Sequence, residues 1–446
     1  QLSSKPLNNR SSRNRFLCSS IDSYNSKLPL FPMAKILLVT SKQPSTNPRI
    51  RKSAHALAAA GHDVHLQYEY SSRWASQADI RIFADCHWSH NLVGGHPSKS
   101  WWTYFFNRAK AKWARWLGKS ESHFSPCAQE HLRQALIFQP DVVIGHNPGM
   151  LPVLAQLKAC SNIPVIFDAE DYHRGEFVSG SFEALAIEQL EKSTFPILDG
   201  ITFASPLFES EYKRNFILLN TAVIHNSFPK RHLGKHIESR QTEHALKIVW
   251  FSQVVGLDRG LLEFLVGMNR CSSIPIEFTI VGSCSQALKD VISRAQRQPH
   301  HQLHFRSPLQ EAELFALIAD HEIGLALEVP DVKNRDLCWT NKLFVYPLCG
   351  CLTLMSDTTA QVSFHKEYPM LGEVINLQDP SSIEHVIRAQ FDARQDLFRR
   401  RLDIIAFAEE EMNWEFDSLT LVKFVQDMLT MHKCDSPHEF SPSNEC

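Results

Sequence analysis

Hydrophobic and polar positions alternate along the chain in blocks. Short, continuous apolar runs are separated by longer stretches in which apolar residues recur every three or four positions. A continuous run predicts a strand of a parallel sheet covered on both faces, and the longer spacing predicts a helix. In the first half of the chain the predicted strands are 35–40, 63–68, 141–146, 164–169, 200–205 and 222–227.

The same pattern begins again after a polar segment. Residues 228–244 are charged and contain no continuous apolar run, which is typical of a linker. We therefore predict an α/β protein with two tandem doubly wound, Rossmann-like domains that face each other across a cleft. The strands predicted for the second domain are 247–252, 276–282, 302–307, 322–327, 351–356 and 373–376.

The length of 446 residues is too great for a single core and suits two domains. We place an N-terminal domain at 33–228 and a C-terminal domain at 245–432. Residues 1–32 are rich in Ser, Asn and Arg and lack an apolar signal region, so we predict a disordered extension. Met33 is then the expected start, with a transit peptide as the alternative. Residues 433–446 are a predicted disordered tail.

Composition narrows the class of protein. The net charge of −2 and the pI of about 6.9 do not favour nucleic acid as a partner. Eleven cysteines occur without a CxxC pair, and the histidines at 299–305 have no matching acids or thiols, so we predict reduced thiols and no metal site. No apolar run is long enough to span a membrane. These features predict a cytoplasmic protein.

Ligands of doubly wound sheets bind beyond the carboxyl ends of the strands, so the residues there are candidates. After the first strand, Asn47 precedes a helix and Arg49 lies in its first turn. A cation there opposes the helix dipole, so Arg49 either meets an anion or is simply solvated. After the third strand, His146 either contacts a ligand or caps the next helix, and Asn147 follows it.

The next strand ends in "DAEDYHRGE", residues 168–176. Asp168, Glu170 and Asp171 lie at its beginning, among further ionisable side chains. This density of ionisable groups directly after an apolar strand is unusual for a structural loop, and it favours a functional one.

In the second half, a predicted anion site combines two cations. Gly256 and Arg259 lie between a strand and a helix, and the next strand ends in Gly282, where a ligand could approach closely. Thr340 is the predicted N-cap of a further helix, which places Asn341 and Lys342 in its first turn. Because Arg259 and Lys342 each open a helix of the same domain, we interpret them as a diphosphate site and not as exposed surface cations.

Residues 101–119, "WWTYFFNRAKAKWARWLGK", interleave seven aromatic residues with cations and contain no acid. This composition suits an amphipathic helix at an anionic membrane interface. The alternative is a helix that packs its Trp side chains on the N-terminal domain.

The order of five segments resembles the GT-B glycosyltransferases, specifically the group-1 or family-4-like retaining enzymes. The segments are "KILLVTSKQPSTNPRIRKSAHALAAAGHDV", "PDVVIGHNPGMLPVL", "PVIFDAEDYHRGE", "VVGLDRGL" and "TNKLFVYPLCG". The resemblance implies sugar transfer from a nucleotide-diphosphate donor, without a metal or another cofactor. It also implies that the donor binds mainly the C-terminal domain and that the acceptor binds the N-terminal domain.

The resemblance also implies individual roles. Arg259 and Lys342 match the positive pair that holds the diphosphate, and with them we predict donor contacts from Gly256, Gly282, Glu328 and Asn341. The predicted catalytic residues are His146, Asp168, Glu170 and Asp171. The predicted acceptor or cleft residues are Asn47, Arg49 and Asn147.

Two departures from the family are visible. Many members carry two glutamates separated by seven residues, but the matching positions here are Leu337 and Val345. Glu328 and Asp336 have the same spacing but fall earlier in the chain. In addition, "PSTNP" replaces the Gly-rich loop that commonly follows the first strand. The loss at Val345 removes the usual ribose contact and leaves the diphosphate cations in place.

We therefore predict a metal-independent, retaining glycosyltransferase that acts on a saccharide or lipid-linked acceptor in polysaccharide biosynthesis, with peripheral membrane contact through 101–119. One alternative is a non-catalytic GT-B scaffold that binds a sugar nucleotide or a partner protein. The other is a nucleotide-sugar epimerase or hydrolase on the same fold.

Overall fold

The computed structural model describes residues 32–231 and 245–435. The predicted extension up to residue 31, most of the predicted linker and the last eleven residues lie outside these ranges. Contacts divide the chain into two compact units. Among the described residues, the first comprises 32–168, 190–201 and 418–435, and the second comprises 169–189, 202–231 and 245–417. The predicted domain boundaries remain predictions.

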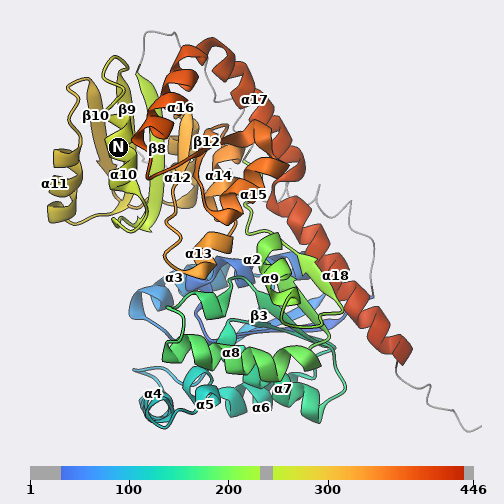
Figure 1. The fold of residues 1–446 in the computed structure, drawn as a ribbon. Helices are drawn as coiled ribbons and strands as arrows, with labels where there is room; N and C mark the ends of the chain where they lie inside the picture. Colours follow the sequence, from blue (N-terminus) through green and yellow to red (C-terminus); the bar gives the residue numbers. More distant parts are fainter. Residues whose placement is uncertain (1–31, 232–244, 436–446) are drawn as a thin grey trace, which may run out of the picture. The chain divides into compact units, whose positions relative to one another are not determined.

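The first sheet has seven strands in the order β3-β2-β1-β4-β5-β6-β7. Its strand β3 is labelled in Figure 1. The pairings from β3 to β5 are parallel. Strands β4 and β5 are buried at every residue, as their continuous apolar runs predict. The strands are β1 (Lys35–Thr40), β2 (Asp63–Glu69), β3 (Ser89–Val93), β4 (Val142–His146), β5 (Val165–Ala169), β6 (Gly200–Phe203) and β7 (Thr221–Val223).

The second sheet has six parallel strands in the order β10-β9-β8-β11-β12-β13. Both sheets thus show the doubly wound pattern, in which the strand order reverses beside the first strand. The predicted α/β class with two Rossmann-like sheets is confirmed. The strands are β8 (Leu246–Val254), β9 (Ile276–Ser283), β10 (His301–Arg306), β11 (Ile323–Ala326), β12 (Leu352–Ser356) and β13 (Gly372–Ile375).

Helices connect the strands, as parallel pairing requires. Those up to residue 213 are α2 (Pro48–Ala59), α3 (Arg73–Ala84), α4 (Trp101–Trp116), α5 (Ser120–Phe124), α6 (Ala128–Phe138), α7 (Leu151–Cys160), α8 (Phe182–Thr194) and α9 (Pro206–Lys213). The later ones are α10 (Leu261–Met268), α11 (Gln286–Ala295), α12 (Glu311–Ala319), α13 (Lys333–Leu337), α14 (Lys342–Leu348), α15 (Thr359–Glu367), α16 (Pro380–Asp392), α17 (Arg394–Glu411) and α18 (Trp414–Asp435).

The sequence pattern misses one strand. Strand β3 has the sequence SHNLV, and only Val93 is buried in it. It lies at the end of the strand order and pairs with β2 alone. An edge strand needs no continuous apolar run, so the criterion that finds buried strands passes over it.

None of the helices that the structure describes combines the length and the apolar character needed to cross a membrane.

Candidate functional site

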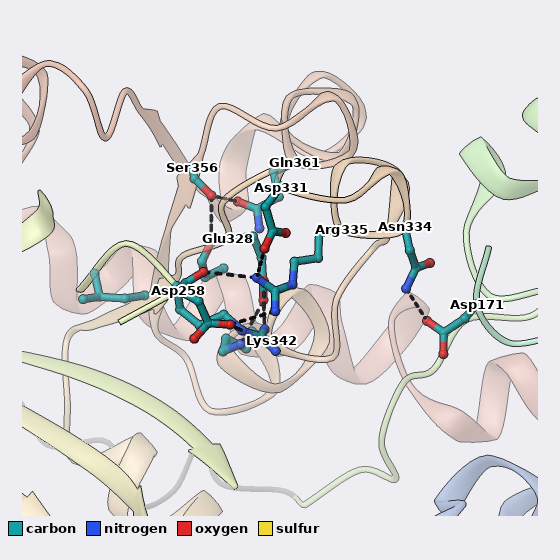
Figure 2. Close-up of polar contacts among 12 residues, drawn as sticks. Asp171, Asp258, Glu328, Asp331, Asn334, Arg335, Lys342, Ser356 and Gln361 are labelled. Atoms are coloured by element: carbon teal, nitrogen blue, oxygen red, sulfur yellow. Dashed lines mark hydrogen bonds and ion pairs between the residues drawn. The ribbon is translucent and has the colours of Figure 1, made fainter. Parts of the chain in front are cut away.

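A buried glutamate in the second unit holds two cations together. Glu328 follows β11 and is 2% exposed. Arg259 Nη1 donates to both of its carboxylate oxygens, at 2.7 and 2.8 Å. Lys342 Nζ lies 3.3 Å from Oε1 of Glu328 (Figure 2). We call Arg259 and Lys342 the cation pair. Two positive charges face the single charge of Glu328, an excess that suits an anion, and the exposed Asp258 lies 3.8 Å from Arg259 Nε as a second acidic partner.

The sheet topology explains why these side chains meet. Strands β8 and β11 are neighbours, and the strand order reverses between them. Arg259 lies in the loop after β8, Glu328 lies in the loop after β11, and Lys342 is the first residue of α14. The cluster therefore occupies the switch point of the sheet, where doubly wound folds bind ligands.

Helix starts near the cation pair differ from the prediction in two details. Helix α10 begins two residues after Arg259 with Gly260 as its N-cap, so Arg259 lies in the loop and not in the first turn. Gly260 has φ +77°, a conformation that glycine adopts without strain. The N-cap of α14 is Asn341 and not Thr340, so that prediction is wrong by one residue. Lys342 opens the helix as predicted.

Helix α14 packs closely on β11, which brings Lys342 to Glu328. A Cβ on Gly324 would lie 2.2 Å from Tyr346 Cδ1, so only glycine leaves room for the tyrosine ring. The Tyr346 hydroxyl donates to the carbonyl of Leu325 at 3.0 Å. The Lys342 ammonium also lies 5.9 Å from the ring centroid of Trp250, within the range of a cation–π contact.

Four further residues support the cluster and were not among the predicted site residues. The Glu328 N–H donates to Ser356 Oγ at 2.8 Å, and this hydroxyl donates to Gln361 Oε1 at 3.1 Å. Arg335 Nη2 donates to Asp258 Oδ2 at 2.8 Å, which ties α13 to the loop of Arg259 (Figure 2). Ser356 ends β12, so the rule that led to the other strand ends could also have found it.

The two acids with the family's spacing have different partners. Asp336 accepts from the N–H and from the hydroxyl of Thr359, both at 2.8 Å, at the start of α15. Only Glu328 joins the cation pair. Val345 is 1% exposed and belongs to the hydrophobic core of the second unit. An ionised side chain in such surroundings would be costly, so the apolar residue matches its environment.

Protein atoms fill the space beside both predicted glycines. A Cβ on Gly256 would lie 2.3 Å from Asp258 Oδ1. A Cβ on Gly282 would lie 2.5 Å from the carbonyl oxygen of Ser252. At Gly282 the near atom is backbone, so glycine permits close packing there, whereas the exposed Asp258 side chain beside Gly256 can move aside. Close approach of a ligand at either glycine stays a prediction.

In the first unit, three predicted residues form a second buried cluster. Arg49 Nε donates to Asp168 Oδ2 at 2.6 Å and Nη2 donates to Oδ1 at 2.7 Å. His146 Nδ1 lies 3.0 Å from Asp168 Oδ2. The three side chains are 1–4% exposed. The anion that meets Arg49 is thus a carboxylate of the protein itself.

This cluster fixes the charge of Asp168. Burial alone would raise its pKa, but the Arg49 guanidinium and His146 outweigh burial and hold the pKa well below its usual range. Asp168 is therefore ionised at neutral pH and positions His146. His146 Nε2 is buried, and among the described residues it finds no hydrogen-bond partner. A buried polar nitrogen without a partner is costly unless a ligand completes it.

Both predicted asparagines have structural contacts. Asn47 is the N-cap of α2, and its Oδ1 accepts from the Ile50 N–H at 3.2 Å. Asn147 has φ +71° and its Oδ1 accepts from the Thr40 hydroxyl at 2.8 Å. Thr40 and His146 end the adjacent strands β1 and β4, where the first sheet reverses its order. The roles of Asn47 and Asn147 toward an acceptor stay predictions.

The loop after Asp168 contacts α13 within the second unit. Asp171 Oδ1 accepts from Asn334 Nδ2 at 3.0 Å (Figure 2). The Tyr172 N–H donates to Asn334 Oδ1 at 2.8 Å. Burial raises the pKa of Asp171 to about 6, and the nearby Glu176 adds to the effect. Glu170 is half-buried in the same loop.

Metal independence stays a prediction. Ligand atoms of Asp171, His173 and Glu176 lie within 4.8 Å of one another, close enough to share an ion. His173 Nδ1 already contacts Glu176 Oε1 at 2.5 Å, so the arrangement also has an explanation as an ion pair.

Comparisons with known proteins rest on structure alone. No family model matches the sequence, and a search of curated proteins finds no match. A glycosyltransferase from Rickettsia africae matches with a TM-score of 0.63 at 11% identity over 91% of this chain and 100% of that chain. HepE from Anabaena, solved with UDP, matches with a TM-score of 0.63 at 13% identity over 89% of this chain and 100% of its own.

Sucrose-phosphate synthase from Thermosynechococcus elongatus has a similar fold. It matches with a TM-score of 0.62 at 12% identity over 89% of this chain and 100% of that chain. All three are glycosyltransferases with the GT-B fold. The fold predicted from the sequence resemblance is therefore confirmed.

Proposed function

We propose that this GT-B protein is a glycosyltransferase that takes a sugar from a nucleotide-diphosphate donor. The observation that carries the proposal is the convergence of Arg259 and Lys342 on buried Glu328 at the switch point of the second sheet. The fold supports it, since the similar structures are glycosyltransferases and the HepE structure contains UDP.

The cation pair supplies what the chemistry needs. When the bond between the anomeric carbon and the phosphate oxygen breaks, negative charge grows on the departing nucleoside diphosphate. Fixed cations stabilise this charge without reorganisation, and removing one such group typically costs 10²- to 10³-fold in rate. Glu328 holds the pair in position and, by our proposal, its Oε2 also contacts the donor.

The acceptor side of the proposal rests on His146. Its Nε2 is buried and lacks a partner among the described residues, and its Nδ1 lies 3.0 Å from Asp168 Oδ2. We propose that Nε2 contacts a hydroxyl of the reacting sugars. Transfer with retention, without a metal, then follows the path in which the acceptor oxygen bonds the anomeric carbon and its proton passes to the leaving phosphate. A saccharide or lipid-linked acceptor in polysaccharide biosynthesis and a cytoplasmic location belong to the same proposal.

One experiment tests the donor site. Calorimetric titration of the chain from Met33 with UDP, GDP, ADP and dTDP, without added metal, should give one clear binder, and the corresponding sugar nucleotides should then be turned over. Lys342→Ala should abolish detectable binding. Lys247→Ala is the matched control. Lys247 is the second residue of β8, at the end of the strand opposite to the Arg259 loop, and its Nζ lies 2.8 Å from Asp320 Oδ2. Equal loss in both variants would refute the assignment.

Val345 supports a second candidate function. Its buried, apolar surroundings leave this position without the acid that the family uses for the ribose. A non-catalytic GT-B scaffold would bind a nucleotide weakly or not at all and would turn over no sugar. A nucleotide-sugar epimerase or hydrolase would instead consume the donor when no acceptor is present, so assays with and without acceptor separate the three.

A further inference from the structure

Helix α4 presents an apolar face away from the protein. Trp102, Phe106, Trp113 and Trp116 are 73%, 70%, 72% and 84% exposed. Their spacing of three to seven residues places them on one face of a helix with 3.6 residues per turn. A surface helix normally packs its apolar side chains on the protein, whereas α4 exposes these four aromatic side chains on its outer face.

The opposite face of α4 holds the helix to the first unit. Ala114 is 4% exposed, and Asn107 Nδ2 donates to the carbonyl of Gly94 at 3.2 Å. These residues lie seven apart, on the side away from the aromatic face. The exposed aromatic residues are therefore not needed to fold the helix, and the sequence-based alternative, in which the Trp side chains pack on the domain, is wrong for Trp102, Trp113 and Trp116.

Cations flank the aromatic face. Arg108 and Lys112 lie to one side of it on the helix, and Lys110 lies to the other. Arg108 also stacks on Tyr104 at 5.0 Å, and Lys110 donates to the carbonyl of Pro126 at 3.0 Å. No acid occurs from 101 to 119. The whole chain is nearly neutral, so this positive charge is local.

An apolar groove adjoins the same face. It has a volume of about 370 Å³ and is lined by α4, the turn after it and α5, including Phe106, Trp113 and Leu117. Figure 1 shows α4 beside α5. Lys110 and Lys119 complete its lining. The groove thus joins apolar walls to two cations, which is the chemistry of an acyl chain below an anionic headgroup.

We propose that the α4 face, meaning the outward side chains of 101–119 and the adjoining groove, docks on an anionic lipid bilayer. Aromatic side chains insert at the boundary of headgroups and acyl chains, and the flanking cations contact anionic headgroups. A second copy of the chain fits less well, because a two-fold interface sets the same patch against itself and opposes cation to cation. The inference is independent of sugar transfer.

The test is co-sedimentation of the full chain with vesicles at low salt. Vesicles of phosphatidylcholine with phosphatidylglycerol should pull the protein down, and vesicles of phosphatidylcholine alone should do so much less. Raising the salt should weaken binding, since headgroup attraction falls off within a Debye length. Binding to neither vesicle type, or equal binding to both, would overturn the proposal.

Double substitutions separate the aromatic contribution to lipid binding from the cationic one. Trp102→Gln with Trp116→Gln should abolish sedimentation, whereas Ile217→Gln with Leu219→Gln, at side chains 90% and 87% exposed in the second unit, should leave it unchanged. Arg108→Gln with Lys112→Gln should lower vesicle affinity by about thirtyfold. Circular dichroism confirms that each variant is folded.

Self-association is the competing outcome. If sedimentation equilibrium without lipid shows a dimer that the double Trp variant loses, and vesicles do not bind, the α4 face is an interface between copies and the lipid proposal fails.

Discussion

Replacing Glu328 with Gln tests whether the cation pair is built to meet a diphosphate. The change keeps the shape of the side chain and removes the charge between Arg259 and Lys342. Removing one partner of a buried ion pair costs about 3–5 kcal/mol, because the remaining charge is left buried and unpaired. Lys342 is 9% exposed at its side chain, but Arg259 is 31% exposed and water screens part of its charge. We therefore expect a loss near the lower end, about 3 kcal/mol.

The loss of stability should be partly reversed by an anion. For a folding unit of 150–250 residues, about 3 kcal/mol lowers Tm by roughly 6–12 °C. Pyrophosphate has the diphosphate group of a donor without its base and sugar, so it is a suitable probe. Bound at a hundredfold excess over Kd it would stabilise by about 2.7 kcal/mol. In Glu328→Gln neither cation faces the charge of Glu328, although Arg259 Nε still lies 3.8 Å from Asp258 Oδ2. Pyrophosphate should therefore raise Tm by more than it does in the unmodified chain.

Differential scanning calorimetry with and without pyrophosphate measures both effects. Glu322→Gln is the control, since Glu322 is 5% exposed at the other end of β11 and accepts from the Lys247 N–H at 2.7 Å. It should lose stability, but its response to pyrophosphate should equal that of the unmodified chain. The reasoning fails if Glu328→Gln gains no extra shift, or if Glu322→Gln gains the same one.

Three further predictions follow from individual contacts. Arg259→Ala and Lys342→Ala should each lower turnover by roughly 10²- to 10³-fold while urea unfolding shows a folded protein, and near-normal turnover in both would refute the donor site. Arg49→Ala should lower the free energy of unfolding by about 3–5 kcal/mol, because it leaves Asp168 buried without its guanidinium, and adding Asp168→Ala should restore part of the loss. Burial raises the pKa of Asp171 from 3.8 to about 6, so its stabilising contribution is full below about pH 4 and is lost as pH rises through 6. The Tm of Asp171→Asn should therefore rise relative to that of the unmodified chain as pH increases from 4 to 7. A difference in Tm that does not change with pH would contradict this.

The sequence by itself determined most of the fold. Twelve predicted strands correspond to strands of the structure. Those buried at every residue, such as β4 and β5, are apolar because both of their faces are covered, whatever their neighbours are. The polar residues at the ends of these strands can also be identified locally, which predicts Arg259, His146 and Asp168 as site residues. The predicted helix start adds Lys342. Local rules failed where burial was partial, as in β3, and they placed the start of α14 one residue early.

Only the tertiary structure decided which charges meet. Arg49 and Asp168 are separated by 119 residues along the chain, and their pairing depends on which loops the sheet brings together. In the same way Glu328, and not Asp336, contacts the cation pair, and the separation of the two acids along the chain does not predict which of them does so. Apolar periodicity is a property of each segment and can be read locally. The partner of a buried charge depends on the packing of distant segments, and this is fixed only when the whole sheet has formed.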